Sequence, residues 1–359
     1  MLKKNKLRLG AVASLAIAGI AFGTVSANAD PNLPQFRTLS GAGSDTTQDV
    51  LNGLSTVIPA VGSYDATGST QIQTKVGGVL FNRPNGSTAG VQALSASANN
   101  TGTRTFPASG GVSITGQVDF ARSSSAPSSG SPGTDLTFIP FAQDALTYAF
   151  NSASDVARSI PRGVASDAPT KLTLRNIYAC TRTSFINSDG DPVTFRPLIP
   201  QGTSGTRSFW LTALGIGTYG SCVTDLGNTV QEHDGSFLTG PGDLVPFSIA
   251  QYISQGNYAG LPTPVNERRG QAVLGNIDGA KPIVFGTSGV ELNTFFSPSF
   301  VRPVFNVVQT SRLGEPTIAA TFVGSGSAVC SAVSTIRQYG FAPIGNCGNT
   351  TTFKQGFRY

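Results

Sequence analysis

Three short turns rich in Gly, Ser and Thr carry the residues best suited to chemistry in this sequence. They span residues 40–45, 86–88 and 202–206, and apolar residues at helical spacing follow each one. A helix N-terminus presents unpaired backbone N–H groups and the positive end of the helix dipole. Glycine lets the backbone approach a ligand closely, and Ser or Thr hydroxyls donate to ligand oxygens. Facing one cleft, the three turns would hold a small oxyanion.

The residues after each turn predict a helix. The apolar positions of the three helix faces are Val50, Leu51, Leu54, Val57 and Ile58; Val91, Leu94 and Ala98; and Trp210, Leu211 and Leu214. Asp45 followed by Gln48 resembles a capping box. Ser, Thr and Asp also serve as ordinary N-caps, so one such turn alone indicates a helix start and no ligand.

Short apolar runs between the turns predict buried strands. They cover residues 117–120, 137–141, 145–150 and 301–308. Strands that alternate with helices predict an α/β fold, and the chain is longer than one hydrophobic core usually supports. We therefore expect two α/β lobes, each with a mostly parallel sheet flanked by helices.

The N-terminus predicts export. Four basic residues precede an apolar run over residues 9–25, and an A-x-A site follows at residues 27–29. This is the pattern of a secretory signal peptide over residues 1–29, cleaved after Ala29. A retained membrane anchor is the alternative, but glycines interrupt the apolar run. Since no cysteine lies near the cleavage site, we expect no lipid anchor and a protein that is secreted or associated with the cell wall.

The signal peptide also carries much of the net charge. The chain has 24 Lys+Arg against 19 Asp+Glu, and four of the basic residues but none of the acidic ones lie in residues 1–29. The remaining chain is nearly neutral, so we expect no surface for nucleic acid and no membrane insertion after signal removal. A bound anion must be held by local dipoles and a few charges.

Four cysteines in an oxidising compartment predict disulfides and permit three connectivities. Cys180 with Cys222 and Cys330 with Cys347 close the shortest loops, and we interpret both pairs as structural. Zinc is not expected, because the spacings are long and no histidine lies near them. Residues 187–191 come nearest to a calcium loop but predict a hairpin turn. We expect no metal and no cofactor.

A serine hydrolase or phosphatase-like enzyme is the alternative from another functional class. Ser204 lies in a glycine-rich turn before a helix, but a nucleophile elbow would need glycine at Thr206. The single histidine, His233, stands beside Asp234 in an expected loop over residues 227–243. We interpret it as a solvated loop residue. A surface structural protein without a small ligand would also suit the Gly, Ser and Thr richness.

In pattern and order, the motifs resemble the phosphate-binding proteins of bacterial ABC importers, which belong to the type II periplasmic-binding-protein class. The resemblance covers most of the chain after residue 29. The segments that carry it are Gly41-Ala42-Gly43-Ser44, Gly86-Ser87-Thr88, Val118-Asp119-Phe120 with Ser125-Ala126-Pro127, Ile139-Pro140-Phe141 through Ala149-Phe150-Asn151, Asn176-Ile177-Tyr178, Gly202-Thr203-Ser204-Gly205-Thr206 and Arg302-Pro303-Val304.

This resemblance implies two lobes joined by two crossing strands. Residues 30–140 with 305–359 would form lobe 1, and residues 141–304 would form lobe 2. It further implies a monomeric solute-binding protein, not an enzyme, that captures a small oxyanion between the lobes. Inorganic phosphate is the first expectation for the ligand, and an ABC permease is the expected partner.

The resemblance also implies ligand contacts from Asp45, Thr46, Ser87, Thr88, Ser123, Ser125, Ser204, Gly205 and Thr206. Two carboxylates of the family are missing, because Ser125 and Gly202 stand in their places. A buried carboxylate accepts the proton of protonated phosphate and repels fully ionised sulfate. Asp45 could take over this acceptor role, and Arg122 or Arg207 could replace the family's arginine, whose place Pro200 takes. The alternative is that Asp45 is a helix cap and both arginines lie on the surface.

Overall fold

A computed structural model describes residues 30–31, 36–98, 104–263, 265–286 and 289–359. The expected signal peptide lies outside the described residues. Within these ranges, no helix combines the length and the apolar character that crossing a membrane requires. The central sheet has the strand order β12 (Arg196–Pro197), β13 (Asp243–Ser248), β8 (Leu136–Asn151), β18 (Val301–Gln309), β7 (Phe120–Ser123), β1 (Leu39–Gly43) and β2 (Val61–Ser63).

Strand direction differs between the ends and the middle of this sheet. At one end β1 pairs in parallel with β2 and β7, and at the other β12 pairs in parallel with β13. In the middle, β8 and β18 run antiparallel to each other and to their outer neighbours β13 and β7. β14 (Ala272–Leu274) and β19 (Lys354–Gln355) also pair antiparallel with β8. The predicted α/β class is confirmed.

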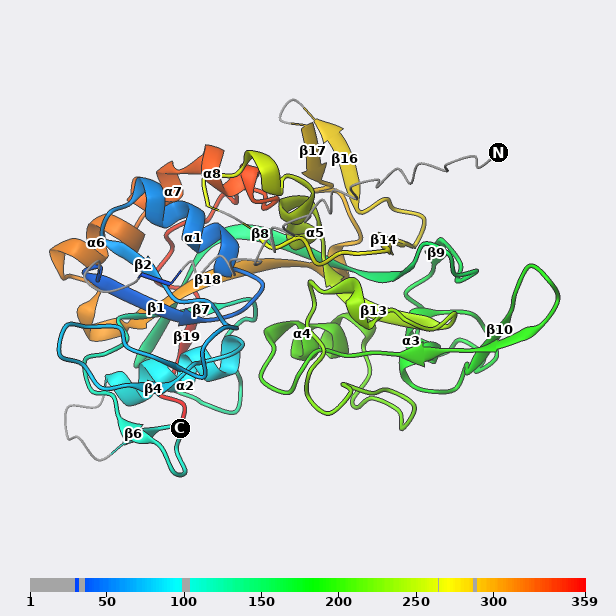
Figure 1. Cartoon of the computed structure of the whole chain (residues 1–359), viewed down its shortest axis with the longest axis horizontal. Helices are drawn as coiled ribbons and strands as arrows, with labels where there is room; N and C mark the ends of the chain where they lie inside the picture. Colours follow the sequence, from blue (N-terminus) through cyan, green and yellow to red (C-terminus); the bar gives the residue numbers. More distant parts are fainter. Residues whose placement is uncertain (1–29, 32–35, 99–103, 264, 287–288) are drawn as a thin grey trace, which may run out of the picture.

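The two strands β8 and β18 run between the two halves of the molecule (Figure 1). Sequence analysis predicted separate strands over residues 137–141 and 145–150, whereas β8 continues unbroken through Asn151. The intervening residues stay extended because Ala142, Gln143 and Asp144 pair with β18. The pairing shifts between Val304 and Phe305, which pair with Ala142 and Pro140, so β8 carries one extra residue there, and such a bulge bends its strand locally.

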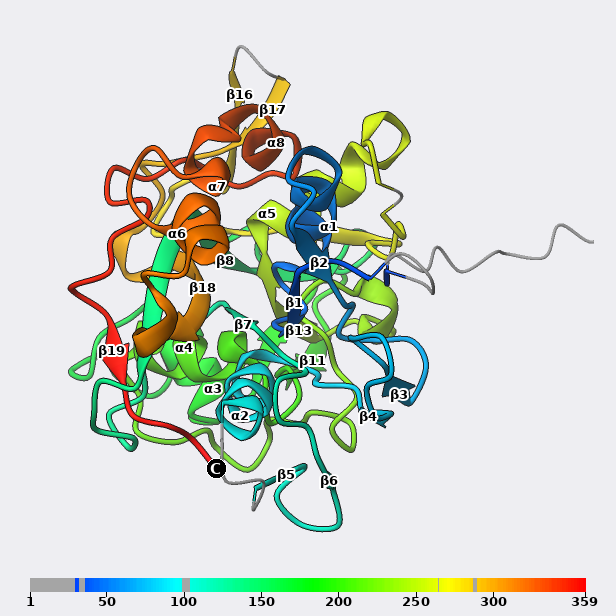
Figure 2. The same ribbon diagram turned by 90° about the vertical axis from the view of Figure 1, so that its left-hand side faces the viewer.

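Helices pack on both faces of the strands β1, β2 and β7. Over the described residues the helices are α1 (Gln48–Val57), α2 (Ser87–Ser97), α3 (Leu174–Tyr178), α4 (Gly205–Leu214), α5 (Ile249–Gly256), α6 (Pro316–Phe322), α7 (Ala328–Ser331) and α8 (Val333–Gln338). α1, α6, α7 and α8 share one apolar cluster, and α2 packs in another on the opposite face (Figure 2). The three predicted helices after the glycine-rich turns are thus confirmed as α1, α2 and α4.

The capping-box prediction is wrong. The N-cap of α1 is Thr47, and its side chain makes no capping hydrogen bond. The Gln48 side chain instead accepts from the backbone N–H of Ala66 at 2.9 Å. Asp45 lies before the helix and accepts from the Thr46 N–H at 3.1 Å.

Short hairpins, bridges and turns complete the chain. The small strands are β3 (Gln71–Ile72), β4 (Phe81–Asn82), β5 (Thr105–Phe106), β6 (Val112–Ser113), β9 (Ser159–Ile160), β10 (Ser184–Ile186), β11 (Pro192–Thr194), β15 (Asn276–Ile277), β16 (Ile283–Gly286) and β17 (Gly289–Leu292). The 3₁₀ turns are η1 (Gly235–Phe237), η2 (Tyr258–Gly260), η3 (Pro298–Phe300) and η4 (Thr310–Arg312). The antiparallel pair of β10 and β11 confirms the hairpin predicted at residues 187–191.

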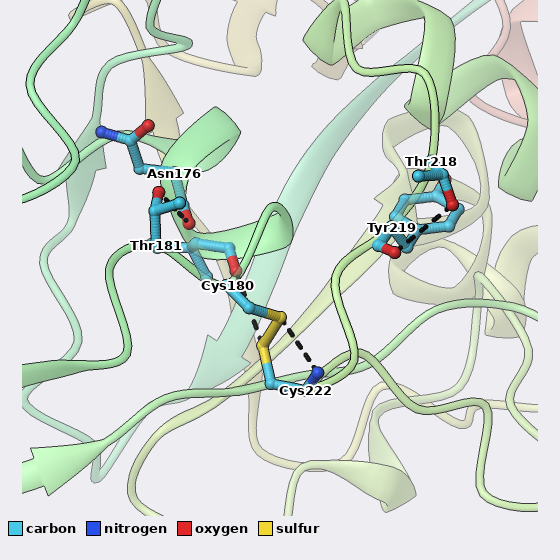
Figure 3. Close-up of a disulfide and its surroundings, with 7 residues drawn as sticks. Asn176, Cys180, Thr181, Thr218, Tyr219 and Cys222 are labelled. Atoms are coloured by element: carbon cyan, nitrogen blue, oxygen red, sulfur yellow. Dashed lines mark hydrogen bonds between the residues drawn. A yellow bond between two sulfur atoms is a disulfide. The ribbon is translucent and has the colours of Figure 1, made fainter.

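Both local disulfides predicted from the sequence are present. Cys180 bonds to Cys222, and Cys330 bonds to Cys347. Figure 3 shows the first bond, which ties the turn after α3 to the segment after α4, with the Cys222 N–H donating to Cys180 Sγ at 3.0 Å. The second lies among the C-terminal helices. Both bonds are local, with the two cysteines 42 and 17 residues apart along the chain.

Candidate functional site

The N-terminal ends of α1, α2 and α4 meet between the two lobes. Thr46, just before α1, places its hydroxyl 3.3 Å from that of Ser124, which follows β7. The Ser124 hydroxyl lies 3.2 Å from that of Ser87, the first residue of α2. A Cβ on Gly205, the first residue of α4, would lie 2.5 Å from the same Ser87 oxygen. The three turns that sequence analysis singled out therefore face one point.

The carboxylate of Glu232 occupies this point. Its Oε1 accepts hydrogen bonds from Thr46 Oγ1 and, at 2.9 Å, from Thr206 Oγ1. Its Oε2 accepts from Ser204 Oγ at 3.0 Å. Thr46 lies just before α1 and the other two hydroxyls lie at the start of α4, so one buried carboxylate joins the two helix N-termini. A carboxylate is itself an oxyanion, so the three hydroxyls already act as donors to an oxyanion in this structure.

Arg302, on β18, brings a guanidinium to the cluster. Its Nη2 lies 2.9 Å from Asp144 Oδ2 and 3.4 Å from Thr46 Oγ1. Asp144 also accepts from Ser248 Oγ at 3.0 Å, which holds the ion pair in a hydrogen-bonded setting. Arg302 is 1% exposed, and its Nη1 has no hydrogen-bond partner among the described residues. This nitrogen is a buried donor suited to an anion.

Asp45 and His233 lie beside the carboxylate of Glu232. Asp45 Oδ2 is 4.0 Å from His233 Nδ1, and both side chains are buried. Burial, together with repulsion from Glu232, raises the pKa of Asp45 well above its ordinary value. Burial, and secondarily the charge of Arg268, lowers the pKa of His233 well below its ordinary value. At neutral pH the imidazole is therefore neutral.

The prediction that His233 is a solvated loop residue is wrong. Its loop packs against β13 and α5 through backbone contacts. The Ser248 N–H donates to the Glu232 carbonyl at 3.0 Å, and Gln255 Nε2 donates to the His233 carbonyl at 2.8 Å. These bonds hold the backbone of Glu232 and His233, whose side chains are both buried. Ser204 donates to Glu232 and not to His233, so the geometry does not support a serine–histidine pair.

The two arginines named from the sequence have other partners. Arg122 is fully buried, not on the surface, and its guanidinium donates to the carbonyls of Ser44 and Tyr64 at 3.1 and 2.6 Å. Arg207 pairs with Asp225 at 2.8 Å. Arg122 thus stabilises the turn before α1, and Arg207 stabilises the loop after α4. Neither guanidinium is directed at Glu232 by these bonds.

The other predicted residues lie at the edge of the cluster. Thr88 is half-buried, and its N–H donates to the Thr203 carbonyl across the lobes at 3.1 Å. The hydroxyl of Ser123 donates to the Ser125 carbonyl at 2.8 Å, so this pair shapes the loop that presents Ser124. Thr203 Oγ1 also donates to the Asn85 carbonyl at 2.6 Å. These bonds bring the two lobes into contact over the site.

Sequence analysis missed Glu232 and the role of Arg302, whereas Ser124 lies within the loop over residues 123–125 that it singled out. Glu232 has no motif of its own, although it immediately precedes the single histidine. Arg302 was noticed only as the start of a return strand. The one available signal was the presence of charged residues in the predicted crossing strands and the loops beside them.

Comparisons with known proteins concern the fold. No protein-family model matches the chain, and no curated protein matches it. A solved structure of a putative phosphate ABC transporter substrate-binding protein with bound phosphate from Clostridium perfringens matches with a TM-score of 0.51 at 13% identity, over 85% of this chain and 99% of that one. An ABC-type phosphate transport receptor from Vibrio cholerae matches with a TM-score of 0.49 at 15% identity, over 85% and 100% of the two chains.

A phosphate binding protein from Stenotrophomonas maltophilia matches with a TM-score of 0.47 at 13% identity, over 86% of this chain and 91% of that one. The fold assignment rests on the Clostridium structure. This chain has the fold of a phosphate ABC transporter substrate-binding protein, as the resemblance of the motifs predicted. At such low identity the likeness shows the fold alone.

Proposed function

We propose that this protein is a solute-binding protein that captures a small oxyanion, inorganic phosphate first, between its two lobes. The observation that carries the proposal is the convergence of Thr46, Ser204 and Thr206 hydroxyls around one buried carboxylate. Donors from both lobes would close around a ligand and replace its water. The fold shared with the Clostridium phosphate-binding structure supports the same role.

The donors of the site match a tetrahedral anion. Helix N-termini supply N–H groups and favourable dipoles, and the Arg302 Nη1 is a further buried donor. Each hydroxyl carries a single proton, so a bound oxyanion competes with Glu232 for the same three donors. On binding, the hydroxyls would turn toward the ligand, and Glu232 would become free to accept a proton from it.

This acceptor role sets the expected specificity. Phosphate near neutral pH still carries a proton and can donate it to Glu232, whereas sulfate cannot. A buried carboxylate facing fully ionised sulfate is repelled. Glu232 thus takes the acceptor role that sequence analysis gave to Asp45. We propose it as the residue that favours phosphate over sulfate.

The same proposal covers the biological setting. Residues 1–29 would direct export, and the protein would act as a monomer, secreted or held at the cell wall. Residues 30–140 with 305–359, and residues 141–304, would be the two lobes. Binding breaks no bond in the ligand, so no enzymatic step is involved. An ABC permease would receive the ligand.

Calorimetric titration of the purified protein with phosphate, sulfate and a phosphate ester tests the proposal. We expect one phosphate per chain and weaker sulfate binding. Thr206→Val keeps the shape of the side chain and removes one donor, so phosphate affinity should fall roughly 10-fold or more. Thr212→Val, on an exposed turn of the same helix, is the matched control and should leave affinity unchanged.

The variant Glu232→Gln tests whether Glu232 sets the preference for phosphate over sulfate. The amide can donate where the carboxylate cannot, so the preference for phosphate over sulfate should narrow. If none of the three anions produces heat or raises the unfolding temperature of the wild-type protein, the proposal is wrong. A preference unaltered by Glu232→Gln would remove Glu232 from the specificity argument.

A further inference from the structure

A cluster of metal-ligating side chains lies beside the hydroxyl donors. Asp45, Glu232 and His233 each offer a ligand atom, and these atoms lie within 4.8 Å of one another. All three residues are buried, at 0% exposure. Asp45 comes from the turn after β1 in the first lobe, and the other two come from the loop before β13. The cluster therefore spans the boundary between the lobes.

Two of these side chains have ligand atoms without partners. Among the described residues, neither ring nitrogen of His233 accepts or donates a hydrogen bond, and Asp45 Oδ2 accepts none. A buried polar atom that is left unpaired destabilises the folded protein. Asp45 Oδ2 lies 4.0 Å from His233 Nδ1. A ligand placed between them would satisfy both.

The charges in the site point to a cation. The Arg302 guanidinium is already paired with Asp144 at 2.9 Å. Asp45 and Glu232 form two further buried acid groups, and the charge of Glu232 disfavours ionisation of Asp45. Buried charges are paired or bind metals, because isolated ones are strongly disfavoured. A divalent ion would balance the two carboxylates.

We propose that Asp45, Glu232 and His233 bind one divalent transition-metal ion of the zinc or cobalt type. Ligand atoms lie about 2.0–2.2 Å from such an ion, and so about 3.3–3.6 Å from each other in a tetrahedral site. The 4.0 Å separation of Asp45 and His233 and the widest pair in the cluster both exceed this distance, so the ion would draw the side chains together by small rotations. Glu232 keeps lone pairs for the ion, because a carboxylate can accept about four bonds.

The donor set selects the kind of metal. An imidazole nitrogen with two carboxylates suits first-row transition ions, with zinc and cobalt bound more tightly than manganese. Magnesium retains several waters and calcium needs six to eight oxygens, which a dry site with one nitrogen does not supply. This inference goes beyond oxyanion capture and does not depend on it. A bound cation would also offset the negative charge that an anion meets on entry.

The single histidine of the chain makes the test sharp. Untagged full-length protein secreted by its host is stripped with a chelator, freed of the chelator and titrated with Zn²⁺, Co²⁺ and Mg²⁺ in phosphate-free buffer. We expect one Zn²⁺ per chain, bound far more tightly than Mg²⁺. His233→Ala should weaken Zn²⁺ binding roughly 100-fold or more, and Asp45→Asn should weaken it as well. Zn²⁺ should raise the unfolding temperature of the wild type but not of His233→Ala.

Asp189→Asn is the matched control, because it removes an exposed carboxyl from the hairpin that most resembles a calcium loop. It should bind Zn²⁺ as the wild type does. Circular dichroism without metal checks that each variant folds, and His233→Gln replaces His233→Ala if the latter does not. No Zn²⁺ binding by the wild type at about 1 mM metal overturns the inference, as does unchanged affinity in the folded His233 variant. Phosphate binding without Zn²⁺ binding would leave the proposed function intact and remove this inference alone.

Discussion

At the scale of the residue, two buried arginines show that partners decide the role of a side chain. Arg122 directs its guanidinium to backbone carbonyls and a hydroxyl of the first lobe, such as the Tyr64 carbonyl at 2.6 Å. Arg302 pairs with Asp144 and contacts Thr46, and its Nη1 has no partner among the described residues. The same residue type thus stabilises a turn in one place and offers a donor to the site in another.

Asp49, on α1, provides a prediction about pH at this scale. Burial, with the nearby Asp65 adding to it, raises the pKa of Asp49 from 3.8 to about 6. The folded protein therefore holds a proton that the unfolded chain has released, and stability falls as pH rises from about 4 to about 6. Asparagine does not ionise, so Asp49→Asn should remove this pH-dependent loss of folding stability, which amounts to about 3 kcal/mol.

Urea unfolding of wild type and Asp49→Asn at pH 4 and pH 7 measures the effect. The free energy of unfolding of the variant, relative to the wild type, should rise by up to about 3 kcal/mol between the two pH values. Asp189→Asn, at an exposed position, should track the wild type. A variant that tracks the wild type at both pH values would contradict the assignment.

At the scale of the element, the position of α2 depends on a close approach to β1. A Cβ on Gly90, within α2, would lie 2.6 Å from the Gly43 Cα and 2.8 Å from the Ala42 carbonyl of β1. Both neighbours are backbone atoms, which cannot move aside as a flexible side chain can. This contact sets how near the N-terminus of α2, with Ser87, lies to the other donors.

We therefore expect Gly90→Ala to push α2 away from β1. The loss of stability should be about 1–3 kcal/mol despite the better helix propensity of alanine, since overpacking a well-filled interior costs that much. Gly217→Ala is the control, because an added Cβ there meets nothing within 4 Å. Urea unfolding compares the two. Equal stability of both variants would show that the helix can shift without cost.

At the scale of the whole molecule, the lobes meet through backbone contacts at the rim of the site. Gly86 has a φ of +92°, and a Cβ on it would lie 2.5 Å from the Thr203 carbonyl of the other lobe. Thr88 donates to that same carbonyl at 3.1 Å. The close contact between Gly86 and the Thr203 carbonyl therefore requires glycine at residue 86. Since the site residues are buried, the proposed ligand would need the lobes to separate before it could enter.

Gly86→Ala should hinder closure. Apparent affinity falls with the fraction of molecules that can close, so we expect phosphate binding roughly 10-fold weaker or more. Small-angle X-ray scattering with saturating phosphate should give a larger radius of gyration than for the wild type. Gly77→Ala is the matched control, because Gly77 also has a positive φ, of +68°, but an added Cβ there meets nothing within 4 Å. A Gly86→Ala protein as compact as the wild type would refute the role of this contact.

Much of the fold was predictable because its signals are local. The helices α1, α2 and α4 follow from apolar spacing after glycine-rich turns, and the crossing strands follow from apolar runs. The disulfides matched the shortest loops. The one strand that was predicted as two, β8, was misjudged because its continuity depends on pairing with β18 across the sheet.

The sequence by itself determined where helix N-termini and their hydroxyls stand along the chain, since capping and spacing act over a few residues. Only the tertiary structure decided which charges meet them. Thr46 contacts Glu232 across 186 positions and Arg302 across 256. Burial, which raises the pKa of Asp45 and keeps His233 neutral, likewise arises from packing between distant segments. Hydrogen bonds and desolvation depend on distance in space, and no pattern along the chain records that distance.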